Sequence, residues 1–221
     1  MTRQLVALLA LLSVVGCGDI VPPERPAPYQ FSIDCSIDGL CSSAAGDLEL
    51  IFSWPRHSLP VRVWAEPRQD FPLHTARAIR LWTDASIYGE FSAVLISDSQ
   101  VADLIVLLGE PELVIQSSSG VTPLDCRGST PIEVTRDTTI ALPFRITIIP
   151  RAGSGPNELD RCFPTAIAHE FGHTLGLFLN SDDPSDIMFA RPMVASTSLR
   201  DRATFLTLYH TRPTVRLPDG R

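Results

Sequence analysis

The sequence contains no lysine: all 18 basic residues are arginine, against 25 acidic residues, which gives a formal net charge of −7. The arginines are scattered along the chain, whereas a nucleic-acid-binding protein needs a basic patch. No apolar run is long and uninterrupted enough to cross a membrane as a helix. These absences predict a protein that binds no nucleic acid and has no transmembrane helix.

The first 16 residues are typical of a secretory signal. One positive charge, Arg3, precedes the short apolar run Leu5–Val15. The segment Val14-Val15-Gly16-Cys17 resembles the lipobox of bacterial lipoproteins, in which the chain is cut before the cysteine and the thiol carries a diacylglycerol. The alternative is an ordinary signal peptide that contains a cysteine. Cleavage would remove Arg3, so the mature net charge becomes 17 − 25 = −8.

Residues 17–47 are predicted to form a lipid-anchored tether followed by a small disulfide loop. The stretch Asp19–Gln30 holds four prolines, a density that gives an extended linker rather than a fold. Gly18, not aspartate, follows Cys17, and by resemblance to Gram-negative lipoproteins this favours the outer membrane. We therefore expect residues 48–221 to form one domain, tied to the bacterial cell envelope by lipid alone.

The other cysteines are even in number. With Cys17 set aside, Cys35, Cys41, Cys126 and Cys162 remain, and an even number in an exported chain predicts two disulfides. Cys35 with Cys41 would close a small loop, and Cys126 with Cys162 would join a long loop to a helix. A cysteine zinc site is the rival interpretation, but no pair has the spacing of about two to four residues that such sites use.

Hydrophobic periodicity predicts alternating strands and helices. We expect strands at Leu48–Trp54, Val61–Ala65, Phe91–Ile96, Leu104–Leu108 and Phe144–Ile149, with an edge strand around Ile132–Thr135. Helices are expected at Pro72–Ile87, from Pro164 to Gly176, and at Leu199–Tyr209, with a loop at Gly153–Pro156.

The second of these helices carries the sequence HEFGH. His169 and His173 are four residues apart, so both imidazoles lie on one helical face and can reach one ion. Glu170 lies beside them, where its carboxylate can take a proton from a water that zinc has acidified. The motif predicts a zinc site with His169 and His173 as ligands and Glu170 as the catalytic base and acid.

Beyond these five letters, His169–Gly176 matches the opening H-E-x-x-H-x-x-G of the metzincin metalloproteases. Ser185-Asp186-Ile187-Met188-Phe189 resembles the segment that forms the Met-turn under the zinc in matrixin-like members. The resemblance covers about Leu59 to His210. It implies an α+β metzincin-like domain with a twisted, mostly parallel sheet, an edge strand, an active-site helix and a C-terminal helix. It also implies Met188 as the Met-turn residue, a Zn²⁺ cofactor, a peptide or protein substrate and a monomer.

The third histidine ligand of that family is missing. Counted forward from Gly176 its position holds Leu179, and counted backward from Met188 it holds Asn180. Asp182 or Asp183, Asn180 itself, or an added water are the candidate replacements. The remaining histidines, His57, His74 and His210, are expected at the surface.

Two hypotheses follow from these residues. The first is a lipid-anchored zinc endopeptidase, which the retention of Glu170 favours. The second is a surface-binding protein that keeps the fold after catalysis has weakened or been lost, which the missing ligand favours.

Overall fold

The computed structural model describes residues 26–35, 49–113 and 125–219. At its centre is a five-stranded sheet with the order β4-β3-β5-β7-β6. Its members are β3 (Val61–Ala65), β4 (Ala93–Leu95), β5 (Leu104–Leu108), β6 (Cys126–Ser129) and β7 (Phe144–Pro150). All neighbours pair in parallel except β6, which runs antiparallel to β7 at the edge. The predicted α+β class, with a mostly parallel sheet and an edge strand, is confirmed at this level.

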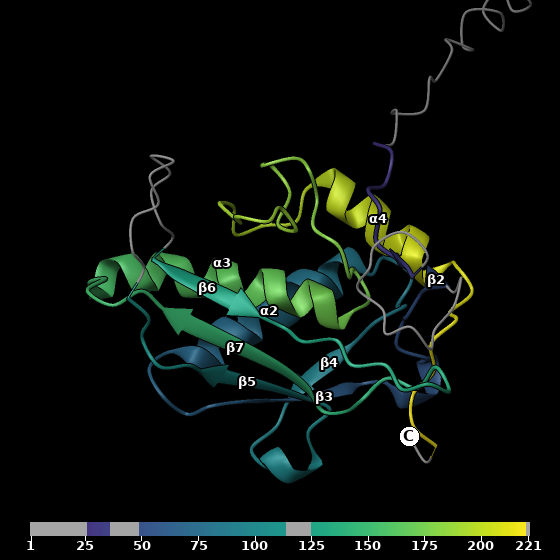
Figure 1. Ribbon diagram of the computed structural model, residues 1–221, viewed down its shortest axis with the longest axis horizontal. Helices are drawn as coiled ribbons and strands as arrows, with labels where there is room; N and C mark the ends of the chain where they lie inside the picture. Colours follow the sequence, from purple (N-terminus) through teal and green to yellow (C-terminus); the bar gives the residue numbers. More distant parts are fainter. Residues whose placement is uncertain (1–25, 36–48, 114–124, 220–221) are drawn as a thin grey trace, which may run out of the picture.

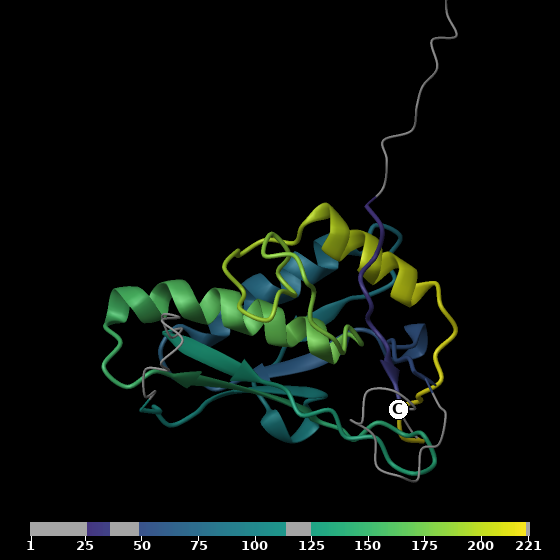
Figure 2. The ribbon, with the colours of Figure 1, turned by 45° about the horizontal axis from the view of Figure 1, so that its top comes forward.

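Three helices lie together on one face of this sheet (Figures 1 and 2). They are α2 (Phe71–Ala85), α3 (Pro156–Thr174) and α4 (Leu199–Tyr209). Buried and more exposed residues alternate along β3 and β7, because successive strand side chains point to opposite faces. The buried set packs under the helices and forms one hydrophobic core.

The predicted strand Leu48–Trp54 is mostly wrong. Among the described residues 49–54, only β2 (Glu49–Leu50) is a strand, and it pairs with β1 (Ile33–Asp34) rather than with the main sheet. The next residues are buried, but the carbonyl of Ile51 accepts hydrogen bonds from the backbone N–H groups of Thr214 and Val215. The apolar pattern predicted correctly that these residues are buried. It could not predict that their backbone would pair with the C-terminal segment instead of the sheet.

The predicted edge strand at Ile132–Thr135 is also wrong. The edge strand is β6, and Val134 forms only an isolated bridge with Ile140. The β6 sequence Cys-Arg-Gly-Ser has low strand propensity. It is held as a strand by its ladder to β7 and by the predicted disulfide between Cys126 and Cys162, which is present.

The helix α3 begins eight residues earlier than expected. Pro156 occupies its first turn, and the side chain of Glu158 accepts a hydrogen bond from the Gly155 N–H at 2.7 Å, which caps the helix. Pro164, expected in the first turn, lies inside the helix. A proline there removes one helical hydrogen bond. Burial of Phe163 and Ile167 on either side of it offsets this loss.

The N-terminal segment described by the structure packs on the domain. Tyr29, which the sequence places in the tether, is buried against α4, where its backbone N–H donates to Thr204. Among the described residues, no helix has the length and apolar character needed to cross a membrane.

Candidate metal centre

Two tryptophans fix the turn of α3 that carries the HEFGH sequence. The indole N–H of Trp82 donates to the carbonyl of Ala168, and that of Trp54 donates to the carbonyl of Thr174, each at 2.9 Å. Both indole rings are fully buried, so these bonds are shielded from water. The backbone on either side of the two histidines is therefore held in place.

Gly176 ends this helix for two physical reasons. Its φ of +103° lies in the left-handed region, which favours glycine. In addition, a Cβ at this position would overlap the backbone carbonyl of Phe52. The chain can turn out of α3 here only without a side chain.

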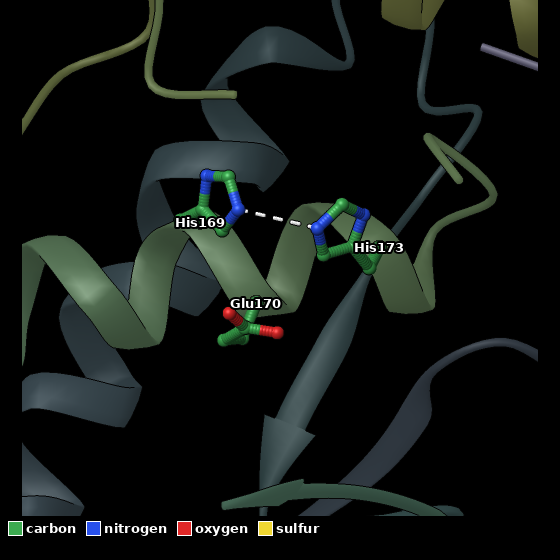
Figure 3. Close-up of side chains that lie close together, drawn as sticks. All are labelled: His169, Glu170 and His173. Carbon is green, nitrogen blue, oxygen red and sulfur yellow. Dashed lines mark hydrogen bonds between the residues drawn. The ribbon is translucent and has the colours of Figure 1, made fainter. Parts of the chain in front are cut away.

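The imidazoles of His169 and His173 face each other across one turn of α3 (Figure 3). Nδ1 of His169 lies 2.8 Å from the carbonyl oxygen of Ile187, and Nδ1 of His173 lies 2.7 Å from that of Leu177. A carbonyl oxygen can only accept, so each Nδ1 carries the proton. The two Nε2 atoms, 3.2 Å apart, therefore present lone pairs to each other.

Both rings are held neutral by their surroundings. Burial, together with the nearby His173, lowers the pKa of His169 to about 4. Burial also lowers the pKa of His173 below its usual value. Two neutral imidazoles with converging lone pairs repel each other weakly and attract a shared cation.

The geometry of the pair fits a tetrahedral zinc ligand set. Two nitrogens that each lie about 2.0–2.1 Å from such an ion are about 3.3–3.4 Å apart. The observed separation of 3.2 Å is close to that value. Among the described His, Cys, Asp and Glu side chains, His169, Glu170 and His173 form the one group placed to hold a metal, with ligand atoms within 4.8 Å of one another.

Glu170 leaves the helix on another side from the two rings (Figure 3). Its Oε2 accepts a hydrogen bond from the hydroxyl of Thr130 at 2.6 Å, and its side chain lies against the backbone of Gly128 in β6. Burial raises the pKa of the Glu170 carboxyl, and the hydrogen bond from Thr130 opposes that shift. The carboxylate is thus confined between α3 and the edge of the sheet.

The predicted Met188 lies directly against α3. It is fully buried, and its sulfur occupies the space that a Cβ on Gly172 would need. The preceding residue, Ile187, holds the ring of His169 through its carbonyl, and its N–H donates to the carboxylate of Asp201 at 2.9 Å. Segment 185–189 is therefore attached to both α3 and α4.

Of the candidate third ligands, Asn180 is the one that contacts the imidazole pair, at His169. Its side chain hydrogen-bonds to His169. Asp182 forms an ion pair with Arg200 at 2.7 Å, and Asp183 accepts hydrogen bonds from the N–H and hydroxyl of Ser185. Neither aspartate joins the metal-holding group.

The other histidines lie outside this group, but one expectation about them is wrong. His57 and His210 are exposed as predicted. His74, predicted at the surface, is buried with 5% of its area exposed, and its ring lies 6.5 Å from that of Phe163 between centroids. It faces inward because α2 buries Phe71, His74 and Ala78 on one stripe.

No protein-family model matches this chain, and no curated protein matches it. The lipidation at Cys17 and the bridge from Cys35 to Cys41 involve positions 17 and 41, which lie outside the described residues. Both stay predictions.

Three contributors to the site were missed in the sequence. Gly128 and Thr130 lie in a turn-rich stretch that carries no motif, so no local signal identified them. Asp201 had a signal: Ser198 and Asp201 form a capping box at the start of α4, in which each side chain binds the backbone N–H of the other residue.

Proposed function

We propose that this chain is a zinc-dependent metalloendopeptidase of the metzincin type, acting on a peptide or protein substrate. The observation that carries the proposal is the pair of imidazoles whose Nδ1 atoms are held by backbone carbonyls and whose Nε2 atoms lie 3.2 Å apart. A histidine that binds a metal through one ring nitrogen commonly donates its other ring N–H to a backbone carbonyl, which fixes its tautomer. His169 and His173 are both fixed in this way. This arrangement favours a pair of zinc ligands over two surface histidines that bind nothing.

Zinc held by these two imidazoles would polarise a water and lower its pKa toward neutrality. Glu170 would accept the proton of the attacking water and pass it to the leaving amine. Burial raises the pKa of its carboxyl, a direction that suits a group that must hold a proton between these two steps.

The edge strand supports a peptide substrate. Among the residues that the structure describes, β6 pairs with β7 on one side only and is the last strand in the sheet order. An edge strand presents backbone N–H and C=O groups to which an extended peptide can add as a further strand. Because the Glu170 side chain lies against Gly128 of this strand, a peptide bound there would lie next to the carboxylate.

The alternative function is a surface-binding protein that keeps the fold with catalysis weakened or lost. Asn180 favours this alternative. It stands where the metzincins have their third histidine ligand and hydrogen-bonds to His169, but its side chain is an amide, and zinc prefers imidazole, thiolate or carboxylate.

Metal content and hydrolysis measured on the same preparations decide between the two functions. We expect the purified domain to bind about one Zn²⁺ per chain and to cleave an unfolded protein substrate, with loss of cleavage on chelation. His169→Ala should lose both metal and cleavage, whereas Glu170→Ala should keep the metal and lose cleavage, because Glu170 handles the proton. Wild type that binds zinc but cleaves nothing supports the binding protein, and wild type that binds zinc no better than His169→Ala contradicts the zinc site itself.

We further propose that the mature chain is a lipoprotein of the bacterial outer membrane, anchored at Cys17. The segment Val14–Cys17 supports this proposal. Labelled fatty acid should enter the full-length protein and be absent from Cys17→Ser, and label that persists in the variant would contradict the anchor.

A further inference from the structure

The edge strand β6 and the helix α3 run side by side, and three contacts join them (Figure 1). Cys126 is bonded to Cys162, Gly128 contacts the side chain of Glu170, and Thr130, directly after the strand, donates to the same carboxylate. Residues 126, 128 and 130 alternate along the chain, as residues on one face of a strand do. The helix that carries His169 and His173 therefore packs on one face of β6.

The contacts are separated by nearly the same distance along α3 and along β6. Cys162 and Glu170 are eight residues apart in α3, a rise of about 12 Å. Residues 126 and 130 span about 13 Å of extended chain. The disulfide holds one end of this pairing, and the contact between Thr130 and Glu170 holds the other.

Gly128 allows the close approach of the carboxylate. A Cβ at this position would overlap Cγ and Oε1 of Glu170. The side chain of Glu170 therefore lies flat on the backbone of β6, in a space that any other residue would fill. One of its carboxylate oxygens is held against Gly128, and the other accepts from Thr130.

We propose that Thr130 is a positioning residue for the reaction: its hydroxyl fixes the orientation of the Glu170 carboxylate beside His169 and His173. The side chain of Glu170 has several rotatable bonds, so its carboxylate can take several orientations. The hydrogen bond that orients it comes from Thr130, across 40 residues of sequence. An effect of Thr130 on kcat rests on the proposed function, whereas its effect on the position of the Glu170 carboxylate does not.

Thr130→Val removes the hydroxyl at nearly constant volume, and Thr130→Ser keeps it. In the zinc-loaded protein we expect Thr130→Val to lower kcat roughly tenfold, a part of what a positioned acid–base group contributes, with KM unchanged. Thr130→Ser should restore kcat to near the wild-type value. Zinc affinity, measured by competition with a chelator, should be equal in all three proteins, since the hydroxyl of Thr130 donates to Glu170, which is not a proposed zinc ligand.

An exposed threonine on α4 provides a matched control. Thr207→Val makes the same change away from the site and should leave kcat, KM and zinc affinity unchanged. A Thr130→Val protein with wild-type kcat would overturn the proposal. So would a loss of kcat that Thr130→Ser shares and that accompanies a loss of zinc, because that result marks a role in folding alone.

Crystal structures of the metal-free variants test the same proposal without activity. We expect the Glu170 carboxylate to leave Gly128 in Thr130→Val and to stay in place in Thr130→Ser. If wild type cleaves no peptide, the proposed function fails and these structures decide the inference by themselves. A Glu170 carboxylate that keeps its position in Thr130→Val overturns it.

Discussion

The hydroxyl of Tyr29 donates a hydrogen bond of 3.0 Å to Asp201, which lies 172 positions later in the chain. The other carboxylate oxygen of Asp201 accepts from the N–H of Ile187, whose carbonyl holds the ring of His169. The segment that the sequence assigns to a tether is thus connected to the candidate metal centre through the side chain of Asp201 and the backbone of Ile187.

Tyr29→Phe should lower the free energy of unfolding by about 1–3 kcal/mol, because it leaves a buried carboxylate short of one donor. Asp201 is fully buried, so water cannot replace the lost hydroxyl. Urea unfolding of the metal-free protein measures the change. Tyr88→Phe is the matched control: Tyr88 is 65% exposed, and its substitution should leave stability within about 0.5 kcal/mol of wild type. Equal effects of the two substitutions would contradict a role for the buried bond.

Gly176→Ala should destabilise the protein more than Gly153→Ala. Both glycines have positive φ, +103° and +88°, so both substitutions introduce backbone strain of about 1 kcal/mol or more. Only at Gly176 would the new methyl group also overlap a neighbour, the carbonyl of Phe52, whereas at Gly153 nothing lies within 4 Å. The difference between the two unfolding free energies measures the contribution of the close contact. A Gly176→Ala protein as stable as Gly153→Ala would mean that the chain end of α3 can move away from Phe52.

The metal-free protein should lose stability as the pH falls through the range in which histidine titrates. Burial lowers the pKa of His169 from 6.5 to about 4, so between these values the unfolded chain binds a proton that the folded chain does not. The free energy of unfolding therefore falls as the pH drops from about 6.5 toward about 4. Burial also raises the pKa of Glu170, which acts in the opposite direction.

A variant isolates the contribution of His169 to this slope. His169→Gln removes the titrating ring, so its free energy of unfolding should change less between about pH 7 and about pH 5 than that of wild type. Urea unfolding of both proteins at several pH values provides the comparison. Identical slopes would mean that His169 is not held neutral by the fold.

The parts of the fold that could be predicted are those whose signal is local. β5 is a continuous apolar run, α4 has helical periodicity, and the motif places two histidines on one face of α3. β6 could not be predicted, because Arg127, Gly128 and Ser129 have no strand pattern. What makes it a strand is its ladder to β7 and its bond to Cys162, which are properties of distant residues.

The same division holds within the site. His169, Glu170 and His173 follow from the spacing of one helix. The contact of Glu170 with Thr130 depends on the register between a helix and a strand that are 40 residues apart in sequence. The carbonyl that fixes the His169 tautomer belongs to Ile187, and the sequence contains no sign of which carbonyl a ring nitrogen will reach.

Asn180→His should raise zinc affinity by at least about 10-fold, since even residues that only hydrogen-bond to a metal ligand change affinity on that scale. The asparagine already reaches His169, so a histidine in its place would bring a third imidazole to the pair. Leu179→His is the matched control: it adds the same side chain one residue earlier and should give no such gain. Peptidase activity should rise with affinity in Asn180→His alone.

Asp182→Ala should leave zinc affinity unchanged, because the carboxylate of Asp182 is paired with Arg200 and has no part in the group that His169 and His173 form. Loss of zinc in Asp182→Ala, or a larger gain in Leu179→His than in Asn180→His, would show that the segment after Gly176 approaches the metal in another way.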